Sequence, residues 1–193
     1  MMLITTIIRI NIMSQLLSIN QWVDPEITVI DEGRSVTFHI QDCFDFHGYD
    51  AVGGVVLGFR LLQAVQRELN HGLPLSRRAV SLFTAFPGLG ARDVFELVTR
   101  MCSEQRFELD TSFEHPVALK GVAGAFYFQF TYDAKSVELS PIEGAPSADF
   151  IATGKASKDP NASKELLAHW TNLKHELANT LLQHTAEQVI RKL

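Results

Sequence analysis

The spacing of hydrophobic residues changes along the chain, and each change predicts a different element. Residues 27–40 carry alternating and β-branched residues on either side of the turn-forming sequence Asp-Glu-Gly-Arg, which predicts a β-hairpin. Between residues 51 and 70, hydrophobic residues recur three and four positions apart, which predicts an amphipathic helix. The residues between these patterns, 41–50 (QDCFDFHGYD), have no clear period and are interpreted as a loop.

The first predicted helix contains three glycines, Gly53, Gly54 and Gly58. Each one weakens a helix by about 1 kcal/mol relative to alanine. Glycines at these positions therefore indicate that another backbone, or a ligand, approaches the helix closely.

The second half of the chain is predicted to be rich in strands. A buried strand at 79–86 leads through Pro-Gly-Leu-Gly at 87–90 into a second helix at 91–102. Three further strands are predicted, at 106–113, 124–132 and 136–140.

Together these elements predict an α+β fold, a mostly antiparallel sheet with helices packed on one face, plus a long C-terminal helix. Residues 1–13 are interpreted as a mobile arm or an over-extended start, and residues 14–143 as the α+β domain. The small and turn-forming residues at 144–163 predict a linker. Residues 164–193 are predicted to form one closing helix, capped by Ser163, that packs on this domain or on a dimer partner.

Composition narrows the class of protein without giving a function. Of the 193 residues, 46% are hydrophobic and 20% are charged, which is enough to bury a sizeable core. The net charge of -5 argues against a nucleic-acid partner, because phosphate binding needs a basic surplus. The apolar start at 1–12 is too short to cross a bilayer and lacks the marks of a secretion signal, so we expect a cytoplasmic protein with no membrane partner.

The segment 41–50 is the richest in chemically active side chains. Two chemistries are compatible with it: His47, Cys43 and Asp45 could ligate zinc or another transition metal, or a carboxylate could orient His47 for proton transfer. An ordinary reading also stays open, in which Asp50 caps the following helix and the other polar side chains are solvated.

Anion binding is a second possible chemistry. Arg60 in the first helix could face a carboxylate or phosphate, although an arginine there can equally belong to a solvated face. The Pro-Gly-Leu-Gly turn leaves free N–H groups at a helix start, where Arg92 could assist. A simple tight turn explains the same residues.

The sequence around His47 also resembles a known family. Phe46-His47-Gly48, then Gly53, then Leu57-Gly58-Phe59-Arg60 resemble the signature Phe-His-Gly-His-x-Cys-Pro-Gly and Leu-Gly-Tyr-Arg of the FmdE-like family, which takes its name from a component of formylmethanofuran dehydrogenase. Residues 90–99 are similar to the family's second, Asp-containing helix, and 126–132 to its later aromatic strand. The resemblance spans roughly residues 35–140.

This sequence departs from the family pattern where the family is suited to bind metal. Tyr49 replaces the second histidine, Ala51 the cysteine and Val52 the proline of the signature, and the cysteine-rich C-terminal ribbon of the family is missing. Any metal would therefore need His47 together with Cys43, Asp45 or Asp50.

The resemblance implies a homodimer with a small-molecule pocket around His47. Residues 43–60 and the start of the second helix would line this pocket, with Tyr49, Asp50, Arg60, Arg92 and Asp93 as ligand-binding candidates.

Three functions follow from the residues and the resemblance together. The first is an accessory protein of the FmdE-like type that binds a metal or small ligand around His47, in the context of one-carbon metabolism. The second is an enzyme that uses His47 as general base and an arginine to hold an anionic substrate. The third is a structural dimer with a decayed site.

Overall fold

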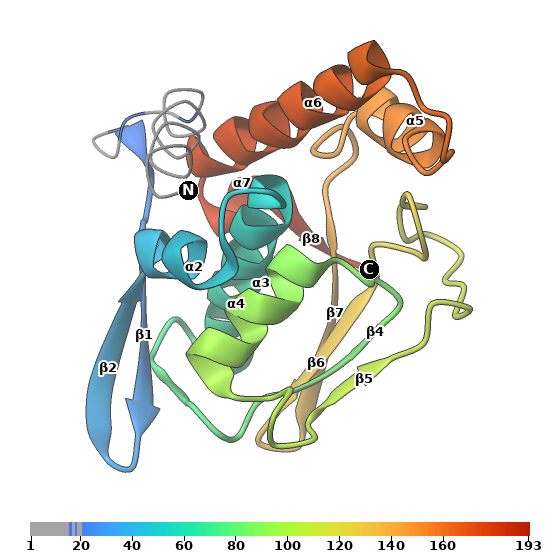
Figure 1. Ribbon diagram of the computed structural model, residues 1–193. Coiled ribbons are helices and arrows are strands. Elements are labelled where there is room, and N and C mark those ends of the chain that lie inside the picture. The colour runs from blue at the N-terminus through green and yellow to red at the C-terminus, as the bar shows by residue number, and fades with distance from the viewer. Residues whose placement is uncertain (1–15, 17, 19–20) are drawn as a thin grey trace.

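The computed structural model describes residues 16, 18 and 21–193, and the predicted arm at 1–13 lies outside the described residues. Within the described part, helices and two sheets make up an α+β fold, as the hydrophobic pattern predicts (Figure 1). In chain order the elements are β1 (Glu26–Asp31), β2 (Arg34–His39), α2 (Ile40–His47), α3 (Val52–Asn70), β3 (Leu75–Ser76), β4 (Ser81–Thr84), α4 (Leu89–Thr99), β5 (Phe107–Leu109), β6 (Phe128–Tyr132), β7 (Lys135–Pro141), α5 (Ala148–Ala156), α6 (Lys164–Leu182), α7 (Ala186–Val189) and β8 (Ile190–Lys192).

The strands form two sheets, where the sequence pattern suggested one. The predicted hairpin β1–β2 is confirmed, and β3 joins β1 to give a three-stranded sheet in the order β2-β1-β3. The other sheet has the order β5-β4-β6-β7-β8. Its neighbours pair antiparallel except β4 and β5, so the mostly antiparallel character is also confirmed.

Helix α3 lies at the centre of the molecule. It contacts α4, α6 and β7, and Figure 1 shows α4 in front of α3, the five-stranded sheet beside these helices, and α5 and α6 across the top of the molecule. Hydrophobic residues occur on nearly every side of α3 and are buried, including Val55, Phe59 and Leu62 at 0% exposure. A helix that is apolar all round is stable only when other elements cover all of it.

The glycines of α3 mark close approaches of other backbones. A Cβ added at Gly58 would lie 2.8 Å from the Cα of Ala91 in α4. A Cβ added at Gly53 would lie 3.1 Å from the carbonyl oxygen of Lys174 in α6. The close neighbours expected from the sequence are therefore helices.

The interpretation of residues 41–50 as a loop is wrong for most of that segment, because Ile40–His47 form α2. The backbone N–H of His39 donates to the Asp42 carboxylate at 2.8 Å, which caps the start of the helix. The buried side chains, Ile40, Cys43 and Phe44, have helical spacing, but the helix is too short for this pattern to stand out from the polar residues around it.

The end of the chain also differs from the prediction of one long helix. Ser163 caps α6 as expected, accepting from the backbone N–H of Leu166 at 3.1 Å, but α6 ends at Leu182. The residues that follow form the short helix α7 and the strand β8, which pairs with β7. The predicted linker at 144–163 contains helix α5, which packs on α6.

Candidate functional site

Two of the residues selected from the sequence meet in the structure. His47 ends α2 and Asp93 lies early in α4, 46 positions further along the chain. The Nδ1 atom of His47 lies 2.6 Å from Oδ2 of Asp93, a short charge-assisted hydrogen bond. We refer to these two side chains as the His47–Asp93 pair.

The pair leaves one imidazole nitrogen available. The His47 side chain is 10% exposed and that of Asp93 is 38% exposed. With the proton on Nδ1 donated to the carboxylate, the lone pair is on Nε2, which makes no hydrogen bond to any described residue. A carboxylate that holds an imidazole in this tautomer prepares Nε2 to accept a proton or to bind a ligand.

Tyr49 and Asp45 hold the segment that follows α2. The Tyr49 hydroxyl donates to Asp45 at 3.2 Å and accepts from the Gln41 side chain at 2.8 Å. The Tyr49 ring also stacks on Phe44, with 5.8 Å between the ring centroids. These contacts fold the chain back onto α2 immediately after His47 and so fix the position of the imidazole.

Asp50 pairs with a lysine that sequence reasoning missed. Its carboxylate lies 2.5 Å from the ammonium of Lys174 in α6. Asp50 does not cap α3, whose N-cap is Ala51, with no side-chain hydrogen bond at that position. One sequence feature could have indicated Lys174. It follows Leu173, which belongs to the buried face of α6, and a long charged side chain beside a buried face can reach the edge of the surface that the helix packs on.

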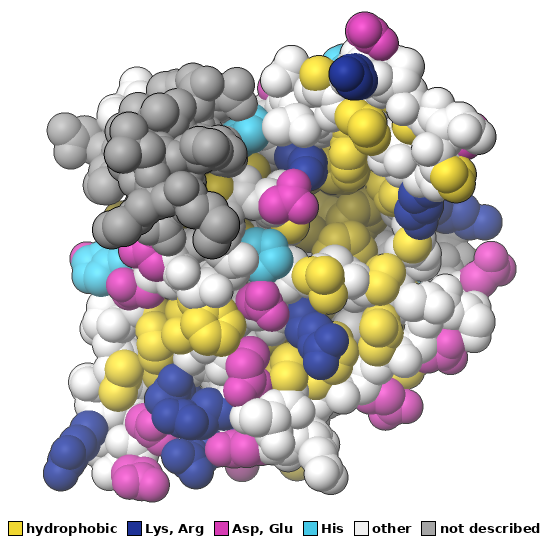
Figure 2. All heavy atoms as spheres, viewed as in Figure 1, with side chains coloured by type: hydrophobic (Ala, Val, Ile, Leu, Met, Phe, Trp, Pro, Cys, Tyr) yellow, Lys and Arg dark blue, Asp and Glu magenta, His cyan; other side chains and the backbone are white. Residues whose placement is uncertain are grey.

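The surface is hollowed near the start of α3, the helix that follows this segment of the chain. Figure 2 shows a recess floored by hydrophobic side chains between α6 and the N-terminal ends of α3 and α4. Two large hydrophobic side chains on the adjoining helices are also exposed, Phe46 in α2 at 53% and Leu89 at the start of α4 at 61%. A recess with an apolar floor and a few polar groups is typical of small-molecule sites.

Arg60, in contrast, is a structural residue. It is fully buried, and its guanidinium donates to Gln63 and to four backbone carbonyls, those of Val23, Asp24, Leu181 and Leu182. Burial lowers the pKa of this guanidinium to about 10. Its five N–H groups are all used within the protein, so none is left for an anionic ligand.

Arg92 also lies away from the imidazole. Its guanidinium carbon is 5.8 Å from the centroid of the Phe107 ring in β5, a cation–π contact. The structure therefore brings His47, Asp93, Tyr49 and Asp50 to one region but directs neither arginine to it.

The residues proposed as metal ligands do not form a ligand set. Cys43 is 1% exposed in the hydrophobic core, and burial, with a smaller contribution from Asp42, raises the pKa of its thiol to about 12. A protonated thiol is a poor ligand for zinc, which binds the thiolate. Across residues 21–193, no three His, Cys, Asp or Glu side chains gather closely enough to hold a metal ion.

Comparison of the sequence with models of known protein families finds no match, and comparison with curated proteins finds none either. In the described part of the chain, every helix is too short or too polar to cross a bilayer.

Proposed function

We propose that the protein binds a small molecule in the recess beside His47 and that His47 removes a proton from it. The observation that carries this proposal is the 2.6 Å hydrogen bond of the His47–Asp93 pair. A carboxylate positioned on Nδ1 keeps Nε2 as the acceptor and stabilises the imidazolium that forms when a proton arrives.

In this reaction the acidic O–H, N–H or C–H bond of the substrate breaks and its proton moves to Nε2 of His47. The bonding electrons stay on the substrate, and Asp93 balances the new positive charge on the imidazole. The hydrophobic floor of the recess holds the apolar part of the substrate and excludes water.

A second candidate is binding without turnover, as the resemblance to the FmdE-like family implies for an accessory protein in one-carbon metabolism. One observation favours it. Arg60 donates all its N–H groups within the protein and Arg92 lies against Phe107, so neither of the two arginines that the enzyme hypothesis assigned to an anionic substrate faces the imidazole. We also keep the homodimer and the cytoplasmic location as predictions of this resemblance and of the sequence.

Ligand screening followed by proton exchange separates the two candidates. Small metabolites are screened for thermal stabilisation of the protein, and each hit is then incubated with protein in D2O and followed by NMR. Proton transfer predicts deuterium exchange or conversion of the hit, lost in His47→Ala and slowed about 10²–10⁴-fold in Asp93→Asn. Stabilisation without exchange supports binding alone.

A second histidine–aspartate pair provides the control. His169 of α6 lies 2.9 Å from Asp149 of α5, but both side chains are about half exposed. His169→Ala should leave binding and exchange unchanged. If His47→Ala behaves like His169→Ala in both assays, and neither loses a bound metal, only a structural role remains.

A further inference from the structure

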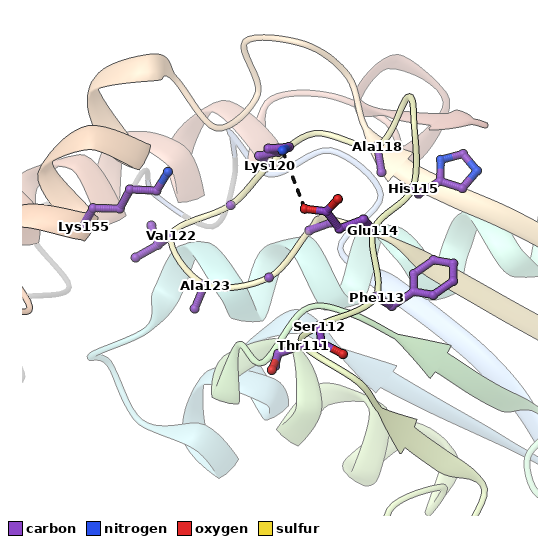
Figure 3. Close-up of a pocket in the computed structure, with 13 residues that line it drawn as sticks. Thr111, Ser112, Phe113, Glu114, His115, Ala118, Lys120, Val122, Ala123 and Lys155 are labelled. Atoms are coloured by element: carbon purple, nitrogen blue, oxygen red, sulfur yellow. Dashed lines mark ion pairs between the residues drawn. The ribbon is translucent and has the colours of Figure 1, made fainter.

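A second cavity lies away from the His47–Asp93 pair. Residues 111–125, which we call the strap, join β5 to β6 and line most of it, and Lys155 of α5 closes the remaining side (Figure 3). The cavity has a volume of about 360 Å³, which is at the small end of the range for ligand sites. It therefore suits a molecule of metabolite size.

The strap is anchored on the face of the sheet opposite α3 and α4. Phe128 packs in the main core, so the preceding residue of the chain, Tyr127, points to the other face. There Tyr127 forms a second hydrophobic cluster with Ala118 and Ala125 of the strap and with Ala85. Ala118 and Ala125, which line the cavity, are thus packed against the sheet.

Glycines allow close packing at two places beside the cavity. A Cβ added at Gly124, which has φ +67°, would overlap the carbonyl oxygen of Ala85 at 1.9 Å. A Cβ added at Gly154 of α5 would lie 2.6 Å from the Val122 side chain. The strap therefore packs tightly on the end of β4 at one side and on α5 at the other, and the cavity between them is already formed.

The charges of the cavity favour a negative ligand. Glu114 and Lys120 face each other across the strap at 3.8 Å, with both side chains more than 80% exposed. Lys155 extends from α5 toward the part of the strap that carries Lys120 (Figure 3), and its ammonium has no hydrogen bond or carboxylate partner among the described residues. His115 also lines the cavity, where its ring stacks on Tyr127.

Backbone donors add to the positive character. Gly121 and Gly124 close a turn through the hydrogen bond from Gly121 N–H to Gly124 C=O, at 2.9 Å. The N–H groups of Val122, Ala123 and Gly124 donate to no acceptor among the described residues. Unpaired backbone N–H groups beside a free ammonium are suited to the oxygens of a carboxylate or phosphate.

We propose that this cavity binds a small organic dianion, a dicarboxylate or a phosphate monoester, between Lys155, Lys120 and the backbone of 122–124. Lys155 pairs with one anionic group of the ligand. Glu114 competes with the ligand for Lys120, so its carboxylate weakens binding. The site is independent of the proposed proton transfer at His47, because neither residue of the His47–Asp93 pair lines the cavity.

Calorimetric titration with succinate, with glycerol 3-phosphate and with neutral glycerol tests this proposal, and NMR locates the bound probe. Wild type should bind at least one dianion and not glycerol, with shifts of the amide signals of 122–124. Lys155→Gln should bind at least about tenfold more weakly. Glu114→Gln should bind more tightly, an opposite change that a purely structural effect would not produce.

Two variants serve as controls. Lys135→Gln removes the same charge at the turn between β6 and β7, far from the cavity, and should bind like wild type. His47→Ala should also bind like wild type, so failure of the proposed function leaves this result intact. The proposal is overturned if neither dianion binds, or if Lys155→Gln and Lys135→Gln bind equally well.

Discussion

At the scale of single residues, burial determines what each histidine can do. In His47, Asp93 engages Nδ1, and Nε2 makes no hydrogen bond to a described residue. His175 of α6 is 5% exposed, its Nδ1 donates to the carbonyl of Thr171 at 2.9 Å, and its Nε2 is buried without a partner among the described residues. An imidazole is therefore a candidate for proton transfer at position 47, whereas burial keeps it neutral at position 175.

The neutral state of His175 predicts a loss of stability in acid. Burial lowers the pKa of His175, whereas an unfolded chain has a histidine pKa of about 6.5. As the pH falls below about 6.5, the unfolded state gains a proton that the folded state does not take up, so the free energy of unfolding decreases. In His175→Phe this contribution disappears, and urea unfolding should show a smaller decrease between about pH 7 and about pH 5.5 than in wild type.

His184 provides the matched control for this measurement. Its Nδ1 makes the same kind of bond, to the carbonyl of Thr180 at 2.8 Å, but that bond is exposed and the residue is only partly buried. His184→Phe should keep the pH dependence of wild type. Equal pH dependence in His175→Phe and wild type would contradict the assignment of His175 as a buried neutral group.

At the scale of elements, the crossing of α3 and α4 positions the His47–Asp93 pair. Gly58 of α3 and Ala91 of α4 bring the two backbones close enough that no side chain fits between them. Asp93 lies two residues after Ala91, and His47 ends α2, which contacts α4 and is joined to α3 by residues 48–51. The placement of α4 on α3 therefore contributes to bringing the Asp93 carboxylate to His47. The packing of α4 against α2 and α3 thereby contributes to the geometry of one hydrogen bond.

Two glycine substitutions in α3 test this packing. A Cβ at Gly58 would lie 2.8 Å from the Ala91 Cα and 3.0 Å from its carbonyl oxygen, so Gly58→Ala should lower the free energy of unfolding by about 1–3 kcal/mol. The helix-propensity gain of about 1 kcal/mol is too small to offset a displaced backbone. Gly54→Ala places its Cβ at ordinary contact distances of 3.6 Å or more and should be neutral or stabilising by up to about 1 kcal/mol.

Chemical denaturation of both variants measures the difference. The interpretation fails if Gly58→Ala is as stable as Gly54→Ala.

At the scale of the whole molecule, the C-terminal third completes the core. Helix α6 packs on α3 through Leu177, Ala178 and Leu181, all buried. The carbonyls of Leu181 and Leu182, at its end, accept from Arg60 in α3. Strand β8 then joins the five-stranded sheet beside β7. The closing helix therefore packs on its own domain.

Two leucines of α6 test this arrangement. Leu181 is fully buried, so Leu181→Ala should lower the free energy of unfolding by about 2–5 kcal/mol, independently of protein concentration. Leu167 is 44% exposed, and Leu167→Ala should change it by less than about 0.5 kcal/mol. Packing on a partner subunit would instead make the loss vary with protein concentration, which equilibrium unfolding at several concentrations detects.

The sequence alone determined the elements whose pattern is long or repeated. The hairpin β1–β2, the helix α3 and the alternating strand β6 were all predicted, because periodic burial of one face leaves a periodic sequence. The helix α2 and the strand β8 were missed, since a short element has too few positions to show a period. The α+β class followed from the longer elements, but the division into two sheets did not, because strand pairing joins residues far apart in the chain.

For the site, the sequence determined that His47 and Asp93 are candidate residues, and only the tertiary structure decided that they meet. The tertiary structure also decided that the Arg60 guanidinium donates hydrogen bonds to backbone carbonyls and that Asp50 pairs with Lys174. The physical reason is that local patterns report which side of an element is buried. Which charged groups come within a few ångströms depends instead on how separate helices pack on one another, and the close approach of α3 and α4 at Gly58 and Ala91 is one of the contacts that set this packing.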